Sequence, residues 1–271
     1  SVARLDSSGR AHVRCRAMPA PAVALAVDGP VARITLNRPE VLNAGDPAWV
    51  AELTAAVSAV AARPELRVAV ITGAGRAFCT GVDLKALAGG AMPLPQFVAW
   101  EDAMTAIERL PLPVIAAING HCLGGGLQLA LVCDHRLAAA EALIGLPAVK
   151  ECLIPSMALY RLPRLIGAAS ARELVLTGEP ISAARAEQLG LVHRVVPGAG
   201  FAGAVNETVE RFLALPRSAV AWSKRLMAEA FDLDFDAFRA RMEAGFRECL
   251  ASPEHAAAMD EIRAGLAKRP R

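Results

Sequence analysis

Two short apolar runs that lead into glycine-rich turns restrict the folds open to this chain. The runs are RVAVIT at 67–72 and VIAAIN at 114–119, and the turns after them lie at 73–75 and 120–126. Continuous apolar runs of this length, rich in β-branched residues, are typical of strands buried on both faces. Helical patterns lie between and after the runs. The sequence therefore predicts an α/β fold of βαβ units around a largely parallel sheet.

The other patterns divide the chain into three parts. Residues 1–22 form an N-terminal extension, in which the alternation over 11–18 predicts one more strand. The α/β core spans 23–197 and a helical region spans 198–271. The core is expected to contain a hairpin over 23–27 and 31–36 and helices over 46–62, 97–109 and 127–132. From about residue 168 strand signals are few, and further helices are expected at 170–176, 182–189, 201–215, 218–231, 235–250 and 254–266.

Composition and charge exclude several classes of function. The 271 residues hold 29 Lys and Arg against 27 Asp and Glu, a net charge of +2 without the positive excess that phosphate backbones require. Aromatic residues make up only 4% of the chain, too few for base-stacking surfaces. No apolar stretch reaches the roughly 18 residues of a membrane span. We therefore expect neither a nucleic-acid partner nor a membrane location.

The six cysteines are scattered along the chain. They form neither a Cys-x-x-Cys pair nor a Cys/His cluster with metal-ligand spacing, so we expect no metal site. Cysteine packs well as a small buried hydrophobe. Six reduced thiols in a cytoplasmic protein are the simplest interpretation.

The glycine-rich turns offer backbone N–H groups near the start of a helix. Such groups lack a partner within the helix and suit the binding of developing negative charge. Neither turn matches a phosphate-binding fingerprint, because 124–126 lacks the spaced G-x-G-x-x-G and no G-x-x-x-x-G-K-[ST] occurs. On these residues alone, tight structural turns explain the pattern equally well.

Longer motifs resemble the crotonase, or enoyl-CoA hydratase/isomerase, superfamily. The similar stretches are LNRPEVLNA at 36–44, AVITGAGRAFCTGVDLKAL at 69–87, PVIAAINGHCLGGGLQLALVCDHRLAA at 113–139, RLPRLIGAASARELVLTGEPISAARAEQLGLVHRVVP at 161–197 and SPEHAAAM at 252–259. The resemblance implies a crotonase-like spiral of βαβ units with a helical C-terminal oligomerisation region, built into trimers or hexamers. It also implies a thioester substrate on coenzyme A, or on an acyl-carrier protein, and no separate cofactor.

The resemblance assigns roles to particular residues. Two backbone N–H groups, those of Val82 and Gly125, are expected to hold the oxygen of a thioester enolate, and a backbone donor needs no particular side chain. The expected contacts to the substrate are Ala44, Val82, Asp83, Leu84, Lys85 and Gly125. Asp83 is expected to cap the following helix. Lys85 is expected to meet a phosphate of coenzyme A or to be an ordinary exposed lysine.

The sequence departs from the family at both acid/base positions. Hydratases of the family use two glutamates to activate a water, and the matching positions here hold Gln128 and Ala148. Gln128 lies three residues after Gly125, so on a helix its side chain shares a face with that turn. A glutamine amide does not exchange a proton near neutral pH, and alanine carries no functional group.

No obvious residue replaces the missing glutamates. The candidates for an acid or base are Glu151, Glu101, Asp102, His121 and Tyr160, and for each a surface or packing role is the simpler alternative. The position of the family's C-terminal aromatic near the adenine holds Ile262.

Two functions of different class remain open. The first is an enzyme that stabilises a thioester enolate without acting as a hydratase, for which isomerisation, decarboxylation and C–C cleavage are the available reactions. The second is a catalytically silent acyl-CoA-binding or assembly subunit. The two oxyanion turns favour an enzyme, whereas Gln128 and Ala148 favour the silent subunit.

Overall fold

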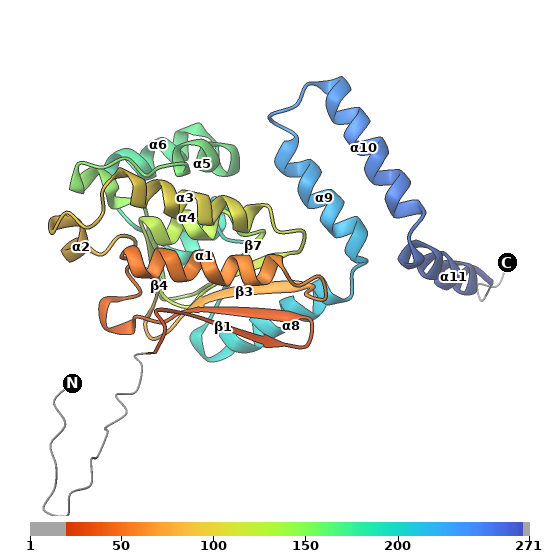
Figure 1. Ribbon diagram of the computed structural model, residues 1–271, viewed down its shortest axis with the longest axis horizontal. Coiled ribbons are helices and arrows are strands. Elements are labelled where there is room, and N and C mark those ends of the chain that lie inside the picture. Colours follow the sequence, from red (N-terminus) through yellow and green to blue (C-terminus); the bar gives the residue numbers. More distant parts are fainter. Residues whose placement is uncertain (1–19, 268–271) are drawn as a thin grey trace, which may run out of the picture.

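A six-stranded sheet forms the centre of the chain, of which the computed structural model describes residues 20–267. Its strands lie in the order β1 (Val23–Asp28), β2 (Val31–Leu36), β3 (Val68–Gly73), β5 (Val114–Ile118), β7 (His135–Ala139) and β10 (Arg194–Val196). The β1–β2 hairpin is antiparallel and every other neighbouring pair is parallel. The predicted α/β class is therefore confirmed (Figure 1).

A second, smaller sheet continues from the first. Its four short strands lie in the order β4 (Ala77–Cys79), β6 (His121–Leu123), β8 (Leu143–Gly145) and β9 (Ile181–Ser182). Because β4, β6 and β8 follow β3, β5 and β7 within a few residues, the chain winds as a spiral of strand–strand–helix turns. The expectation of plain turns at 73–75 and 120–126 was incomplete, since strands of three residues are too short to create an apolar period.

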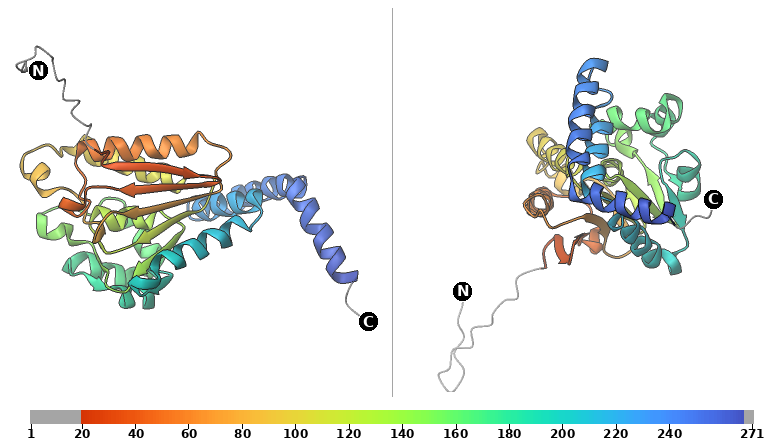
Figure 2. Two further views of the ribbon diagram at one scale, coloured as in Figure 1. Left: turned by 90° about the horizontal axis from the view of Figure 1, so that it is seen from below. Right: turned by 90° about the vertical axis from the view of Figure 1, so that its right-hand side faces the viewer.

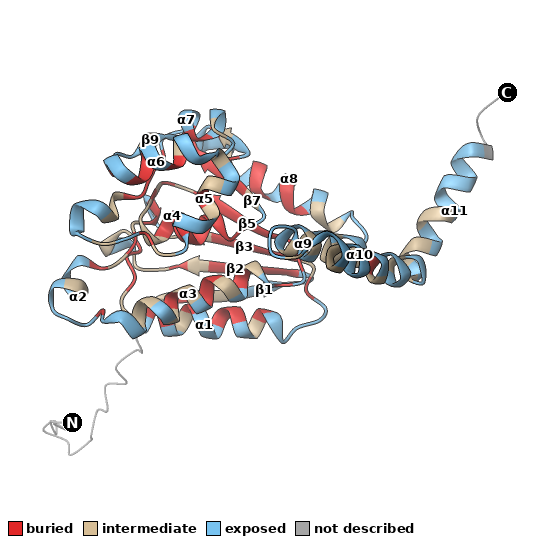
Figure 3. Cartoon of the chain, turned by 90° about the horizontal axis from the view of Figure 1, so that it is seen from above, coloured by how far each residue is buried: buried red, intermediate tan, exposed pale blue. Residues whose placement is uncertain are grey.

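Helices cover both faces of the large sheet (Figures 2 and 3). The helices α1 (Pro47–Ala61), α3 (Leu94–Glu108) and α4 (Gly125–Leu131) bury apolar residues on one face, and α8 (Phe201–Leu213) covers the other. In β3, Ala69 and Ile71 belong to the first core and Val68 and Val70 to the second. This double burial is the reason that the strand sequences are apolar without alternation.

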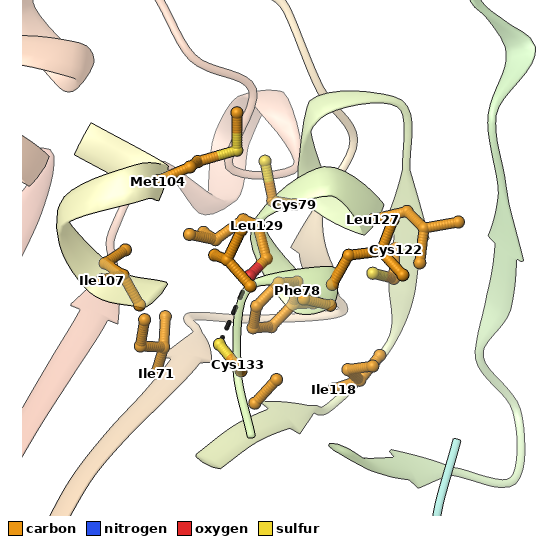
Figure 4. Close-up of a cluster of buried hydrophobic side chains, with 14 of the residues drawn as sticks. Ile71, Phe78, Cys79, Met104, Ile107, Ile118, Cys122, Leu127, Leu129 and Cys133 are labelled. Carbon is orange, nitrogen blue, oxygen red and sulfur yellow. Dashed lines mark hydrogen bonds between the residues drawn. The ribbon is translucent and has the colours of Figure 1, made fainter. Parts of the chain in front are cut away.

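The first core contains cysteines as ordinary packing residues. Figure 4 shows Cys79, Cys122 and Cys133 among large apolar side chains around Phe78. Burial raises the pKa of Cys79 and of Cys133 to about 12, so both thiols stay protonated at neutral pH. The five cysteines within residues 20–267 are all free, in agreement with the prediction, and the sixth lies outside this range.

Seven further helices complete the described chain. They are α2 (Leu84–Ala88), α5 (Ala158–Ile166), α6 (Ala168–Thr177), α7 (Ala183–Gln188), α9 (Arg217–Glu229), α10 (Phe235–Leu250) and α11 (Pro253–Ala267), with short 3₁₀ turns η1 (Pro39–Val41), η2 (Pro147–Glu151) and η3 (Gly198–Gly200). The C-terminal helices agree closely with the predicted ranges. The helix α5 was not predicted, because Pro163 stands inside it.

The C-terminal region divides into two parts. Although the predicted boundary falls after residue 197, α8 packs on the sheet through Ala204, Val205 and Val209. By contrast, α9, α10 and α11 extend away from the α/β core (Figure 1). The predicted strand at 11–18 lies outside the described residues. None of the helices within 20–267 combines the length and the apolar composition of a membrane-spanning segment.

Candidate functional site

A cavity of about 470 Å³ lies between the glycine-rich loops, α3 and the segment from η2 to residue 156. It brings together the predicted oxyanion and substrate-contact residues, the two positions of the missing glutamates and the first candidate base: Ala44, Val82, Asp83, Leu84, Lys85, Gly125, Gln128, Ala148 and Glu151. Leu84 and Lys85 are exposed on α2 and mark its mouth, whereas Gln128 is only 9% exposed. The cavity is therefore a single site built from distant parts of the chain.

The two glycine-rich loops touch each other at the cavity. Gly81 has φ +95°, a left-handed conformation that favours glycine, and a Cβ atom there would lie 2.9 Å from the Gly125 nitrogen. A Cβ atom on Gly126 would lie 2.0 Å from the Cys79 carbonyl oxygen. The glycines therefore have a physical reason beyond tight turns, because they let one backbone approach the other within van der Waals contact.

The Val82 and Gly125 N–H groups have no acceptor among the residues that the structure describes. The neighbouring backbone is fully engaged: the Gly45 N–H donates to the Gly81 carbonyl at 2.8 Å, and the Asp83 N–H donates to the Gly45 carbonyl at 2.9 Å. Backbone N–H groups in a folded protein are nearly always paired, so two free donors in adjoining loops of one cavity are available to a ligand.

An arginine that the sequence analysis did not single out fixes these loops. Arg38 donates to the Ala44 carbonyl at 2.7 Å and forms ion pairs with Asp46 at 3.0 Å and Asp83 at 3.2 Å. Asp83 also caps α2 by accepting the Lys85 N–H at 2.9 Å, as predicted. Because the Asp83 carboxylate is already used by these partners, it lines the cavity as a structural group.

Gln128 and Ala148 both face the cavity, at the positions where the sequence lacks glutamate. Gln128 extends from the first turns of α4, and its buried Oε1 atom has no hydrogen-bond partner within the described chain. Ala148 stands on η2 and is half-buried. The amide is thus free to bond a ligand, while neither residue can transfer a proton.

Glu151 lies at the cavity rim and is exposed. Its neighbour Lys150 does not pair with it, because the Lys150 ammonium bonds to Glu179 at 2.7 Å. The described residues lining this cavity include two carboxylates, Asp83 and Glu151. Because Asp83 is bonded to Arg38 and to the start of α2, Glu151 is the one without a partner among the described residues. It is therefore the first candidate for a base.

The other candidates differ in their surroundings. Glu101 is not a surface residue: its side chain is 15% exposed and forms an ion pair with Arg161 at 2.7 Å. Asp102 is exposed, and His121 lies in β6 away from the cavity lining. The Tyr160 hydroxyl donates to Asp232 at 2.5 Å, outside the cavity, and this bond raises the pKa of the phenol. Of these four residues, only Glu101 is both shielded from solvent and close to the cavity, through its bond to the lining residue Ser156.

Apolar residues of α3 form a wall that the sequence analysis missed. Phe97, Trp100 and Met104 line the cavity, and a Cβ atom on Gly125 would lie 2.7 Å from the Trp100 ring. Their spacing of three and four residues is the signal of a helix face, but that spacing does not distinguish a cavity wall from a core contact.

Comparison with known proteins finds relatives over most of the chain. The family model described as Enoyl-CoA hydratase/isomerase matches residues 27–259. The (E)-benzylidenesuccinyl-CoA hydratase of Thauera aromatica is 37% identical over 228 residues, which are 79% of this chain and 85% of the relative. The crotonyl-CoA hydratase of Syntrophomonas wolfei is 34% identical over 228 residues, 83% of this chain and 88% of the relative.

Solved structures agree with the same assignment of the fold. An enoyl-CoA hydratase from Mycobacterium smegmatis superimposes with a TM-score of 0.84 at 33% identity, covering 92% of this chain and 98% of its own. An enoyl-CoA hydratase from Bacillus anthracis gives a TM-score of 0.84 at 33% identity over 90% of this chain and 96% of its own. The similarity includes both the α/β core and part of the C-terminal helices.

Proposed function

Because the chain belongs to the enoyl-CoA hydratase/isomerase family, the crotonase superfamily, we propose that it stabilises the enolate of an acyl-CoA thioester without being an efficient hydratase. The observation that carries this proposal is the content of one cavity. Val82 and Gly125, whose N–H groups have no acceptor among the described residues, line the same cavity as Gln128 and Ala148. The binding half of the family's chemistry is present and the proton-transfer half is altered.

The two N–H groups act on the thioester oxygen. When a proton or a carbon group leaves Cα, negative charge develops on that oxygen, and two backbone donors there stabilise it. One such donor in a preorganised site is worth about 2.7–4 kcal/mol at the transition state. The Arg38 contacts to Ala44 and Asp83 hold the Val82 loop in place, which favours a preorganised donor on that side of the site. Coenzyme A arrives with the substrate, and the reaction needs no further cofactor.

Hydration needs more than this oxyanion hole. A water must lose a proton as it attacks Cβ, and Cα must receive one, and positioned acid/base groups contribute about 10²- to 10⁴-fold to such transfers. Gln128 orients a water by hydrogen bonding but takes no proton from it, and Ala148 does neither. The relatives named above carry the name hydratase, whereas Gln128 and Ala148 supply no carboxylate to the cavity of this chain.

Double-bond isomerisation and C–C cleavage fit the cavity better than hydration. Both pass through the enolate and require one base, for which Glu151 at the rim is the candidate. Decarboxylation requires no base, because the departing CO₂ itself generates the enolate. The second function, a silent acyl-CoA-binding or assembly subunit, is favoured by the same Gln128 and Ala148 and predicts binding without turnover.

Crotonyl-CoA tests the proposal directly. We expect the purified protein to bind crotonyl-CoA in a calorimetric titration, yet to hydrate it at least 10²-fold more slowly than a family hydratase assayed alongside. Hydration at a rate comparable with that control would overturn the proposal and show that another residue acts as the base, with Glu151 the first to test. Failure to bind any acyl-CoA would reject both the enzyme and the silent subunit.

A further inference from the structure

A polar group interrupts the apolar α3 side of the cavity. Ser156 lines the cavity, and its hydroxyl lies 3.2 Å from Glu101 Oε2 on α3. The other oxygen of that carboxylate, Oε1, accepts a hydrogen bond from Arg161 Nη1 at 2.7 Å. Arg161 also forms an ion pair at 2.9 Å with Glu108, which lies two turns further along α3 than Glu101. These four side chains form a connected network, which we call the α3 network.

The network fixes the direction of the serine hydrogen bond. A carboxylate paired with a guanidinium presents only acceptors, so the Ser156 hydroxyl must donate its proton to Glu101. The lone pairs of the Ser156 oxygen then face the cavity as acceptors. Since Glu101 and Arg161 are only 15% and 11% exposed, water competes weakly for this arrangement.

The backbone conformation at Ser156 would favour glycine, which indicates that the serine side chain contributes an interaction there. Its φ is +40°, in the left-handed region where glycine is favoured, and a non-glycine residue there costs about 1–3 kcal/mol. The hydroxyl bond to Glu101 is the interaction that serine supplies and glycine lacks. Such local strain persists where the surrounding structure holds it, and it is frequent at ligand sites.

Charge further restricts the ligand. The α3 network contains two carboxylates, Glu101 and Glu108, and one guanidinium, Arg161, so it carries one net negative charge. Glu151 at the rim has the same sign, and the one cation among the described residues lining the cavity, Lys85, is exposed to solvent on α2 at its mouth, where its charge is screened. An anionic acyl group would therefore be repelled, whereas a neutral hydrogen-bond donor would be attracted to the Ser156 oxygen.

We propose that Ser156 is a specificity-determining residue that selects a neutral acyl group bearing a hydroxyl, with Glu101 and Arg161 as its positioning residues. This inference rests on the proposed acyl-CoA function and adds the class of acyl group. The hydroxyl donates to the Ser156 oxygen, and the apolar side chains of Phe97, Trp100 and Met104 surround the remaining hydrocarbon. No covalent step is involved.

The test compares the affinities of four thioesters that differ in one group: butyryl-CoA, 3-hydroxybutyryl-CoA, 4-hydroxybutyryl-CoA and succinyl-CoA. Calorimetric titration of the unmodified protein should show at least one hydroxyacyl thioester binding about threefold to tenfold more tightly than butyryl-CoA, the gain of one net hydrogen bond. Succinyl-CoA should bind more weakly than butyryl-CoA.

Variants locate the effect. Ser156→Ala and Ser156→Gly should both lose the hydroxyl preference, measured as the ratio of the hydroxyacyl-CoA affinity to the butyryl-CoA affinity, and the glycine variant also relieves the positive φ. Ser58→Ala, an exposed serine on α1, is the matched control and should keep the preference. Glu101→Gln removes the negative charge of that carboxylate, so it should bind succinyl-CoA better relative to butyryl-CoA.

The outcomes separate this inference from the proposed function. If none of the four thioesters binds, the proposed function fails. If all bind but the hydroxyl gives no gain, or if the gain survives in both Ser156 variants, the specificity inference is wrong while acyl-CoA binding stands. A merely structural role of Glu101 would weaken all four thioesters alike and leave their ratios unchanged, which would also overturn the inference.

Discussion

At the scale of single residues, the site depends on positions that lack a group: glycines without a Cβ atom, and two positions without a carboxylate. Gly81 and Gly125 bring two backbones together, and the space between them is too small for one methyl group. Gln128 and Ala148 then set what the assembled donors can do. Binding and proton transfer are thus controlled by different residues and can be altered separately.

The variant Gly81→Ala should disable the oxyanion hole. Its Cβ atom would stand 2.9 Å from the Gly125 nitrogen and displace that donor, so we expect turnover to fall at least tenfold, towards the 10²- to 10³-fold cost of losing one donor. Gly90→Ala is the matched control, because Gly90 also has a positive φ but nothing within 4 Å. Both variants should lose about 1 kcal/mol or more of unfolding free energy, and only Gly81→Ala should lose activity. Equal activities of the two would contradict the close approach.

The double variant Gln128→Glu with Ala148→Glu should gain hydration. Both positions line one cavity with the N–H donors, so two carboxylates there would act on a single water. We expect crotonyl-CoA hydration to rise by about 10²-fold or more, measured by the loss of enoyl absorbance, and each single change to do less. Gains that simply multiply from the single variants would show that the positions do not share a water.

At the scale of helices and strands, the sequence predicted what is long and periodic. The parallel strands 67–72 and 114–119 and the helix at 235–250 lie where expected, because burial on both faces and helical spacing leave clear patterns. The strand β10 was missed, since its three residues follow a helical segment and pair only with distant β7. The roles of Arg38 and Ser156 were missed for the same reason: each depends on partners far along the chain, and one sequence carries no signal of such contacts.

A well-shielded ion pair joins the helix α9 to the core, in addition to the hydrogen bond from Arg217 to the Pro64 carbonyl. The Lys224 ammonium bonds to Asp134 at 2.7 Å and to the Leu112 carbonyl at 3.0 Å, with only 11% of the lysine side chain exposed. Lys224→Met should lower the unfolding free energy by about 1–3 kcal/mol, between the values for exposed and buried pairs. Arg239→Met breaks the exposed pair with Glu243 and should cost less than about 0.5 kcal/mol in the same denaturant titration. Equal losses would mean that α9 is held by other contacts.

The stacked histidines between β7 and β10 should make stability depend on pH. His135 and His193 lie 4.5 Å apart, and burial, then Arg136, lower the pKa of His193 to about 4. Its unfolded pKa is about 6.5, so as pH falls from 6.5 towards 4 the unfolded state binds a proton that the folded state does not, and stability decreases. His193 is more than a third exposed, so solvent weakens the effect. Urea midpoints between pH 7 and 5 should fall less steeply in His193→Asn, and an unchanged slope would contradict this origin.

At the scale of the whole molecule, a single copy of the chain exposes much apolar surface on its C-terminal helices. The helices α9, α10 and α11 project from the core (Figure 2), and many of their large apolar side chains are exposed. These side chains are Met227, Phe231, Phe235, Phe246, Leu250, Ile262 and Leu266, each at least half exposed. Apolar surface of this extent usually marks an interface.

We therefore expect an oligomer, and the family resemblance implies that it is a trimer or a dimer of trimers. Light scattering at micromolar concentration should give about three or six times the monomer mass of 28.4 kDa. Phe235→Asp combined with Phe246→Asp should shift the protein towards smaller species, whereas Arg239→Met, on the same helix, should not. A monomer mass for the unmodified protein would contradict the interface.

The most direct test of the account is exchange of the Cα proton of a bound thioester in deuterated water. Exchange reports enolate formation whatever reaction follows, and it depends on the donors at Val82 and Gly125 rather than on hydration. We predict that, among the thioesters the protein binds, at least one acquires deuterium at Cα faster than in buffer, and that Gly81→Ala reduces this rate at least tenfold. Tight binding with no exchange above the buffer rate for any thioester would contradict enolate formation by proton removal, and it would leave only a decarboxylase or a silent acyl-CoA-binding subunit.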